Sequence, residues 1–266
     1  MVESKYEGHA PLAVVTGGAS GIGEATVRRF AAAGWRTIIA DVNKDRGSAV
    51  AFEISAMGTM AEFVELDVAD EVAVEHFAAQ VQSKHGPVAA LVNSGGVLQN
   101  AVRITKMPIA DFDRIIDINL RGSVLMGRAF GARMAEAGQG AIVNLCSLTT
   151  FQATPQPAYG MSKAAVKMLT EVMAAELGPQ GVRVNAVAPG YTLTPAMKQR
   201  IEKGERDPSA VIAKSALRRF VEPSEIGEAI FFLCSPAAAA ITGVTLPIDC
   251  GWLVYSVYSA AAAQPQ

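Results

Sequence analysis

Short β-branched segments alternate with longer, alanine-rich amphipathic segments along the chain, and this alternation constrains the fold more than any other feature. The apolar runs predict strands over residues 12–16, 36–40, 61–66, 88–92, 140–146, 182–188 and 243–249. The amphipathic runs predict helices near residues 22–33, 43–57, 70–84, 109–136, 157–178 and 224–235. Regular alternation of strands and helices is typical of a parallel sheet with helices on both faces. We therefore expect an α/β fold, a doubly wound Rossmann fold with a seven-stranded parallel sheet.

The chain has no stretch long or polar enough to be an interdomain linker, so residues 1–266 are predicted to form a single domain. One region, residues 195–220, breaks the alternation because it is far more charged than its surroundings. It follows the carboxyl end of a predicted strand, where open parallel sheets bind ligands. We expect it to be a mobile lid rather than a solvated surface insertion. An apolar tail, residues 252–266, follows the last predicted strand.

Charge and cysteine content exclude several classes of function. A formal net charge of −2 with no local basic cluster gives no general attraction for nucleic acid or an anionic membrane. The three cysteines, Cys146, Cys234 and Cys250, form no CxxC pair, and the three histidines show no ligand spacing. We expect neither disulfides nor a metal site. Because the chain also has no apolar run that could span a bilayer and no signal-peptide region, a cytoplasmic protein is expected.

The first predicted strand runs directly into a glycine-rich turn, TGGASGIG, and a helix pattern begins at once. Gly17, Gly21 and Gly23 leave room for a diphosphate to approach backbone N–H groups at a helix N-terminus. Asp41 follows 18 residues after Gly23, at the end of the second predicted strand, where a carboxylate binds a ribose diol. The turn and the acid together predict a dinucleotide site.

Asp41 also bears on which dinucleotide binds. A carboxylate at this place repels and crowds a 2′-phosphate, and the turn carries Ser20 where a phosphate-binding Arg or Lys would stand. Lys44 and Arg46 lie nearby but beyond the acid. The sequence therefore favours NAD over NADP.

A Tyr and a Lys one helical turn apart, Tyr159 and Lys163, open an otherwise alanine-rich helix. At i and i+4 their side chains share one helix face, and a nearby ammonium favours the phenolate. The pair is a candidate acid/base catalyst, although a YxxxK pair arises by chance often enough to need structural context.

In this order and at these intervals, the segments resemble the single-domain branch of the short-chain dehydrogenase/reductase family over about residues 12–251. TGGASGIG fits the family's TGxxxGxG turn and YGMSK its YxxxK pair, while LDVAD, IDINLRGS, IVNLCS and VNAVAPGYTLT match further family segments. Three departures stand out. The family's NNAG reads Asn93-Ser94-Gly95-Gly96, and the interval between Ser147 and Tyr159 is one residue shorter than is common. The family's late DGG reads Asp249-Cys250-Gly251.

The resemblance implies a set of site residues around the carboxyl edge of the sheet. The catalytic residues would be Asn119, Ser147, Tyr159 and Lys163. Together with the turn and Asp41, the cofactor-binding residues would be Gly17, Ser20, Gly21, Ile22, Gly23, Asp41, Asp67, Val68, Asn93, Gly95, Tyr159, Lys163, Pro189, Gly190, Thr192 and Thr194.

The implied roles are those of an alcohol dehydrogenase. Tyr159 would exchange the proton, with its pKa lowered by Lys163 and by the positive nicotinamide ring. Ser147 would hold the substrate oxygen, unless it only caps a turn. Lys163 would also bind the nicotinamide ribose. Asn119 would anchor a water on a proton path, unless it only kinks its helix.

We expect an NAD-dependent oxidoreductase that converts a secondary alcohol, polyol or sugar-like, to the ketone. Polar residues of the substrate loops, Gln152, Thr154, Gln156, Tyr191 and Thr192, favour a hydroxylated substrate, whereas Phe151, Met197, Pro155 and Pro157 suit an apolar one. Reduction of 3-oxoacyl or cyclic ketone substrates is therefore an alternative, and a non-catalytic dinucleotide-binding regulator is another. An epimerase or dehydratase of the longer family branch would need a second lobe.

The helices at 109–136 and 157–178 carry apolar residues beyond the needs of one core face, namely Ala164, Ala165, Met168 and Met173. By family resemblance these faces pair in a homotetramer, with the apolar tail packing across another interface.

Overall fold

The computed structural model describes residues 10–262. Residues 1–9 and 263–266, which include the N-terminal segment and the last part of the predicted tail, lie outside the described residues.

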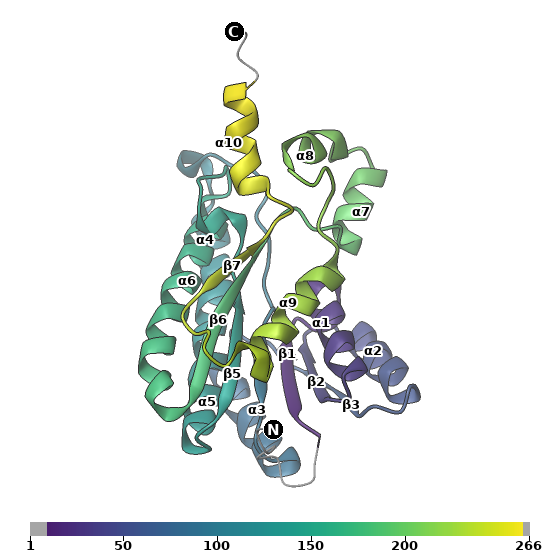
Figure 1. The fold of residues 1–266 in the computed structure, drawn as a ribbon, viewed down its shortest axis with the longest axis vertical. Helices are drawn as coiled ribbons and strands as arrows, with labels where there is room; N and C mark the ends of the chain where they lie inside the picture. Colours follow the sequence, from purple (N-terminus) through teal and green to yellow (C-terminus); the bar gives the residue numbers. More distant parts are fainter. Residues whose placement is uncertain (1–9, 263–266) are drawn as a thin grey trace.

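A single parallel sheet of seven strands forms the centre of the described chain, as the sequence predicts (Figure 1). Its strands are β1 (Leu12–Thr16), β2 (Arg36–Asp41), β3 (Ala61–Glu65), β4 (Ala90–Asn93), β5 (Gly140–Leu145), β6 (Val182–Pro189) and β7 (Thr245–Ile248). The strand order is β3-β2-β1-β4-β5-β6-β7. Strands β1 to β3 are added toward one edge of the sheet and β4 to β7 toward the other, so the order of addition reverses between β1 and β4. Strand β4 begins two residues later than predicted, although the Ala89 amide still donates to the Leu12 carbonyl at 2.9 Å. The switch between β1 and β4 is where such sheets bind nucleotides.

Helices cover both faces of the sheet, and each face has its own core. The α-helices are α1 (Gly21–Ala32), α2 (Lys44–Ala56), α3 (Glu71–His85), α4 (Ile109–Ile116), α5 (Gly122–Glu136), α6 (Pro157–Leu177), α7 (Pro195–Glu202), α8 (Pro208–Lys214), α9 (Pro223–Cys234) and α10 (Trp252–Ala262). Short 3-10 turns lie at Ile104–Lys106, Leu148–Thr150, Gly178–Gln180 and Pro236–Ala238. Side chains of α1, α2 and α9 fill one core and side chains of α3, α5 and α6 the other (Figure 1).

The predicted long helix at 109–136 is interrupted by a π-helical turn, Asp117–Arg121, between α4 and α5. Apolar periodicity does not predict such a turn, because it does not distinguish a short π-helical turn from the α-helix around it. Asn119 lies in the π-helical turn and is fully buried. π-helical turns occur frequently at functional sites.

The predicted lid and tail are mostly helical. The lid contains α7 and α8, and the tail forms α10, which rises from the carboxyl edge of the sheet beside them (Figure 1). The backbone of Leu217 donates to the Cys250 carbonyl at 3.1 Å, so the end of the lid is joined to the root of the tail. No helix among the described residues is long and apolar enough to cross a membrane.

One residue predicted for an assembly face belongs to the core instead. Met173 is 8% exposed and packs beneath Gly127, where a Cβ would come within 2.8 Å of the Met173 methyl carbon. Because Gly127 lacks a side chain, α5 has room for Met173. The large apolar residues of α6 that are exposed are Met161, Met168 and Val172, and Ala164 is exposed as well.

Candidate active site

The glycine turn after β1 is packed so closely that side chains do not fit. A Cβ on Gly17 would lie 2.8 Å from the Gly95 Cα, and Gly17 has a left-handed φ of +64°. A Cβ on Gly23 would lie 2.1 Å from the Gly17 carbonyl oxygen. The turn therefore brings bare backbone to the N-terminus of α1, where Ser20 is exposed and Ile22 packs against the core. This cradle fits a diphosphate.

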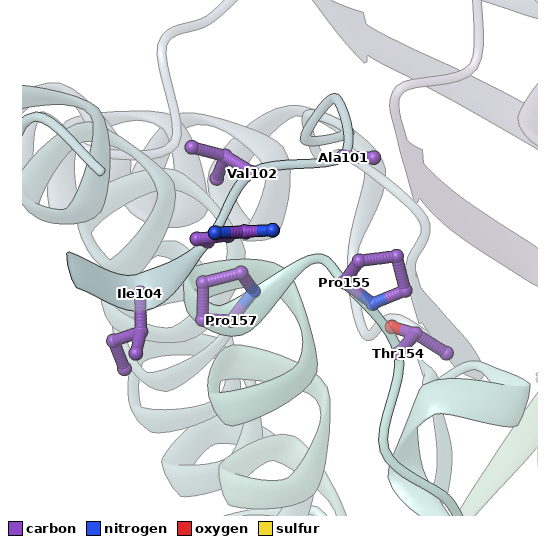
Figure 2. A pocket seen from close by; sticks show the side chains of 7 residues that line it. Ala101, Val102, Ile104, Thr154, Pro155 and Pro157 are labelled. Atoms are coloured by element: carbon purple, nitrogen blue, oxygen red, sulfur yellow. The ribbon is translucent and has the colours of Figure 1, made fainter. Parts of the chain in front are cut away.

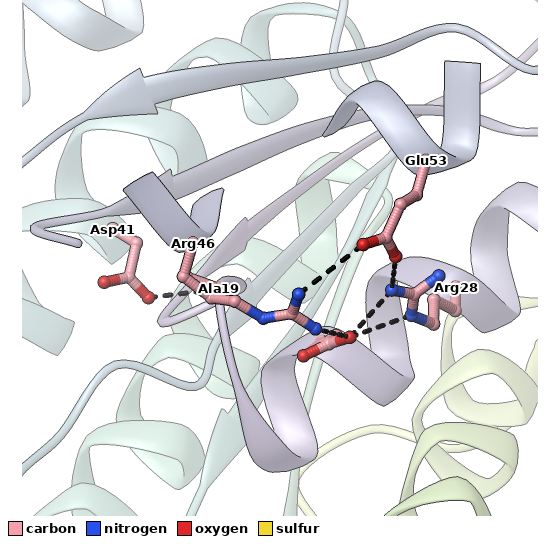
Figure 3. Close-up of polar contacts among 6 residues, drawn as sticks. Ala19, Arg28, Asp41, Arg46 and Glu53 are labelled. Carbon is pink, nitrogen blue, oxygen red and sulfur yellow. Dashed lines mark hydrogen bonds and ion pairs between the residues drawn. The ribbon is translucent and has the colours of Figure 1, made fainter. Parts of the chain in front are cut away.

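Asp41 is fixed beside this turn at the end of β2 (Figure 3). One carboxylate oxygen accepts from the Ala19 amide at 3.1 Å, and the other accepts from the Asn43 amide at 2.9 Å. Each oxygen has a further lone pair. The arrangement holds the acid in place for a ribose diol, and it also has a purely structural use in closing the turn.

The loop after β4 lies against the glycine turn. The Thr16 hydroxyl accepts from the Ser94 amide at 3.1 Å and the Gly95 amide at 3.0 Å. A Cβ on Gly95 would stand 3.2 Å from that hydroxyl, so the glycine relieves a tight contact. Asn93 joins β4 to β5 by donating to the Asn144 side chain at 2.8 Å. Its own buried Oδ1 has no partner among the described residues.

The remaining predicted cofactor residues lie around the same edge. Asp67 accepts from the Ala69 amide at 2.9 Å, and Val68 packs on Gly122 of α5. At the end of β6 the Thr192 hydroxyl donates to the Gly190 carbonyl at 3.0 Å.

Thr194 joins the glycine turn to the lid. Its hydroxyl accepts from the Met197 amide at 3.3 Å and so caps α7. A Cβ on Gly21 would meet the Thr194 methyl at 3.5 Å, which places the first lid helix beside the turn. Pro189 ends β6, immediately before this segment.

Asn119 ties three segments together. Its Oδ1 accepts from the Val97 amide at 2.8 Å, and its Nδ2 donates to the Val97 carbonyl at 3.0 Å and to the Ser162 hydroxyl at 3.2 Å. Ser162 in turn donates to the Tyr159 carbonyl at 2.8 Å. Asn119 thus fixes the start of α6, which carries the candidate catalytic pair.

Lys163 is buried on α6, 6% exposed, and its ammonium donates to the Leu145 carbonyl at 2.7 Å. Its Nζ lies 5.7 Å from the centroid of the Tyr159 ring. Burial lowers the pKa of Lys163 to about 8.

The expected lowering of the Tyr159 pKa by Lys163 is not what the chain's own groups produce. Burial raises the pKa of Tyr159 above its usual value, and hydrogen bonding with Ser147 opposes that rise. Burial is the largest influence on the Tyr159 pKa, because removal from water disfavours the charged phenolate.

Ser147 performs one of the two roles that the sequence left open, because it caps a turn. Its side chain accepts from the Thr149 amide at 3.3 Å and caps the turn at Leu148–Thr150. It also lies beside the Tyr159 phenol and counters part of the rise in the Tyr159 pKa. The cap orients the hydroxyl that faces the phenol.

Sequence reasoning missed several residues that hold the site in shape. Thr16 orients the loop after β4, Ser162 joins Asn119 to α6, and the Gln99 side chain accepts from the Tyr159 amide at 3.2 Å. Two of these residues could have been found from the sequence. Thr16 lies at the end of a strand, and Ser162 follows Tyr159 by three residues on the same helix. Gln99 had no such signal, because its partner, Tyr159 on α6, lies far away in the sequence.

A pocket of about 550 Å³ lies beside the loops before α4 and α6 (Figure 2). Pro155 and Pro157 face Val102 and Ile104 across it, so most of its lining is apolar. The Val102 amide donates to the Pro155 carbonyl at 2.8 Å and fixes the two loops to each other. The pocket borders the first turn of α6 but does not include Tyr159 or Ser147.

Comparison with known proteins decides the family. A family model described as enoyl-(acyl carrier protein) reductase matches residues 17–253. The chain is 39% identical over 251 residues to galactitol 2-dehydrogenase (L-tagatose-forming) of Cereibacter sphaeroides, covering 91% of this chain and 95% of the relative. It is 38% identical over 244 residues to D-threitol dehydrogenase of Mycolicibacterium smegmatis, covering 91% and 93%. The chain belongs to the short-chain dehydrogenase/reductase family.

Solved structures of this family superpose on the chain along most of its length. NAD⁺-bound xylitol dehydrogenase matches with a TM-score of 0.84 and 29% identity, covering 90% of this chain and 97% of that one. ElxO with NADP bound matches with a TM-score of 0.88 and 28% identity, covering 92% and 99%. The family likeness confirms the predicted Rossmann fold and an oxidoreductase that acts on CH–OH groups. It is compatible with either nicotinamide dinucleotide.

Proposed function

We propose that this short-chain dehydrogenase/reductase uses NAD to oxidise a secondary alcohol of a polyol or sugar-like substrate to the ketone. One observation carries the proposal. Ser147, which caps the turn after β5, lies beside Tyr159 at the carboxyl edge of the sheet, and the helix that carries Tyr159 is held by buried Lys163 and by Asn119 through Ser162.

The residues around the edge fit a dinucleotide. Gly17 and Gly23 would face its diphosphate, Asp41 its adenosine ribose, and Lys163 its nicotinamide ribose. When bound, the dinucleotide supplies the acceptor for the hydride that leaves the carbinol carbon. The fixed carboxylate of Asp41 supports NAD rather than NADP, because it would repel a 2′-phosphate.

The chain's own groups handle the proton. Ser147 would hold the substrate hydroxyl near Tyr159, and the phenolate would accept the hydroxyl proton as the C–H bond breaks. Since burial raises the Tyr159 pKa, the phenolate needs positive charge nearby to form at moderate pH. Lys163 and the oxidised nicotinamide ring are the two sources of that charge.

The relatives whose names state polyol substrates support the substrate class, because three of them act on threitol, galactitol or xylitol. A second candidate, an apolar or cyclic ketone, is favoured by the apolar lining of the pocket at Pro155 and Pro157. A non-catalytic regulator would have no use for the paired Ser147 and Tyr159.

The proposal includes a lid, an assembly and a location. The segment 195–220 would close over the substrate, since Thr194 at its root lies beside the glycine turn. Exposed Met161, Met168 and Val172 on α6 would pair with a second copy in a homotetramer. The free cysteines of the described chain fit the cytoplasm. Light scattering at micromolar concentration tests the assembly, and a monomer would contradict it.

The deciding experiment follows NADH formation by absorbance with a panel of polyols, sugars, hydroxy acids and cyclic alcohols, each with NAD⁺ and NADP⁺. The proposal expects turnover on at least one polyol or sugar-like alcohol and a catalytic efficiency at least about tenfold higher with NAD⁺. Turnover restricted to cyclic alcohols would support the second candidate. Tight NAD⁺ binding without turnover on any member would support the regulator.

A further inference from the structure

An arginine stands one helical turn beyond the acid that selects the ribose. The Asp41 carboxylate accepts from the Asn43 amide at 2.9 Å, and the Asn43 side chain accepts from the Arg46 amide at 3.1 Å. Two successive caps therefore tie the backbone of Arg46 to the acid. Arg46 is the kind of side chain that binds a 2′-phosphate, because its planar guanidinium fits phosphate oxygens in pairs.

Two carboxylates hold this guanidinium away from such a task (Figure 3). Arg46 Nη2 lies 2.6 Å from Glu24 Oε1, and Arg46 Nη1 lies 3.6 Å from Glu53 Oε1. Glu24 also accepts from Arg28 Nε at 3.0 Å, and Arg28 pairs with Glu53. Two arginines and two glutamates thus form a closed cluster with no net charge.

Glu24 is the centre of the cluster. Its side chain is 16% exposed, compared with 45% for Glu53, so water screens its interactions less. It also lies in the first turn of α1, directly after the glycine cradle. The negative charge of Glu24 therefore acts on the same region as that of Asp41.

We propose that Glu24 is a second determinant of NAD preference, which acts by holding Arg46 away from the position of a 2′-phosphate. The inference rests on the proposed dinucleotide site and deepens it. In this account Asp41 repels the 2′-phosphate directly. Glu24 keeps the Arg46 guanidinium in an ion pair, so that Arg46 does not offset this repulsion. A cluster that only fastened α1 to α2 would affect stability and leave the preference between the two dinucleotides unchanged.

The test measures binding rather than activity. Dissociation constants for NAD⁺ and NADP⁺ are determined by calorimetry for Asp41→Ala and for Asp41→Ala/Glu24→Gln. The second variant should bind NADP⁺ about tenfold more tightly than the first, with NAD⁺ affinity changed less than about threefold, since one charged contact to phosphate is gained. Adding Arg46→Gln should abolish the gain.

Three controls separate this account from others. Lys44→Gln removes a positive charge from the same helical turn, and the gain should survive it. Glu228→Gln removes a carboxylate from the other ion pair of α1, with Arg29 at 2.7 Å, and should not raise NADP⁺ affinity. Glu53→Gln, on the exposed side, should give a smaller gain of about twofold and remains informative if Glu24→Gln does not fold.

Equal NADP⁺ affinity in the single and double variants would overturn the proposal, as would a gain that persists in the presence of Arg46→Gln. Absence of NAD⁺ binding to the unmodified protein would instead contradict the proposed function. The two failures are therefore distinguishable.

Discussion

The first turns of α6 and the lid with its tail meet at the same edge of the sheet, but they are built differently. The polar groups that fix α6 are buried and paired: Asn119 bonds Val97 and Ser162, and Lys163 bonds Leu145. In the lid and tail, by contrast, the polar contacts are exposed, as between Arg218 and Tyr255. Val254 and Val257 of α10 are 72% and 69% exposed.

The junction of the lid and tail contains polar groups without partners. The Arg206 guanidinium lies 4.8 Å from the Tyr191 ring, and that ring lies 5.5 Å from Trp252. The buried Nε of Arg206 and Nε1 of Trp252 have no hydrogen-bond acceptor among the described residues. Unpaired donors cost stability, so this region is expected to open more easily than α6. The difference suggests that the chemistry is fixed by α6, whereas substrate selection is left to an adaptable cover.

Removing the buried lysine should give the largest effect and confirm that α6 carries the chemistry. Lys163→Met keeps the length of the side chain but removes the ammonium, so turnover should fall about 10³-fold and NAD⁺ binding should weaken. Steady-state kinetics with calorimetric titration measure both. Lys167→Met, one turn further along α6 in the exposed pair with Glu171, is the matched control and should change turnover less than about twofold. Similar losses in both variants would contradict the assignment.

The contribution of each region to stability can be compared by removing one buried amide side chain and one exposed amide side chain. Asn119→Ala leaves the Val97 amide and carbonyl without their partner, so the free energy of unfolding should fall by about 3 kcal/mol. Asn100→Ala removes an exposed contact to Arg200 of the lid and should cost less than about 0.5 kcal/mol. Urea denaturation of both variants measures the difference, and equal losses would remove the contrast.

Truncating the aromatic contact at the root of the tail should affect substrate binding more than the chemical step. Trp252→Ala removes the ring that packs on Tyr191, so KM for the alcohol should rise about tenfold while kcat stays within about threefold. Trp252→Phe keeps an aromatic contact and should stay close to the unmodified enzyme. A fall in kcat with an unchanged KM would place the tail in the chemical step instead.

The smallest effect is a pH dependence of stability caused by the burial of Lys163. Its pKa is lowered from 10.5 to about 8 in the folded chain, so the unfolded chain binds this proton more tightly between those values. Stability should therefore rise with pH in that window and by about 1 kcal/mol between pH 7 and pH 9, relative to Lys163→Met. Denaturation of both proteins at the two pH values tests this, and a constant difference would contradict it.

The sheet, its neighbouring helices and the pair of Tyr159 and Lys163 could be predicted from the sequence, because each leaves a local pattern. Apolar periodicity marks β1 and α6, and the spacing of Gly17, Gly21 and Gly23 marks the cradle. Features that depend on distant partners were out of reach. The π-helical turn at Asn119 and the packing of Met173 under Gly127 depend on elements that meet only in the fold.

The directions in which the pKa values of Tyr159 and Lys163 shift could not be predicted from the sequence either. The i and i+4 spacing of Tyr159 and Lys163 predicted a lowered Tyr159 pKa, but it carries no information on burial. In the fold, burial raises the pKa of the tyrosine and lowers that of the lysine. Only the position of both side chains inside the protein decides the sign.

The central claim is that Tyr159 exchanges the substrate proton, and Tyr159→Phe tests it most directly. The substitution keeps the ring and removes the hydroxyl, so NAD⁺ should bind within a few-fold of normal while turnover falls by at least about 10²-fold across the pH–rate profile. A variant that retains more than about a tenth of normal turnover would contradict this mechanism, whatever the glycine cradle binds.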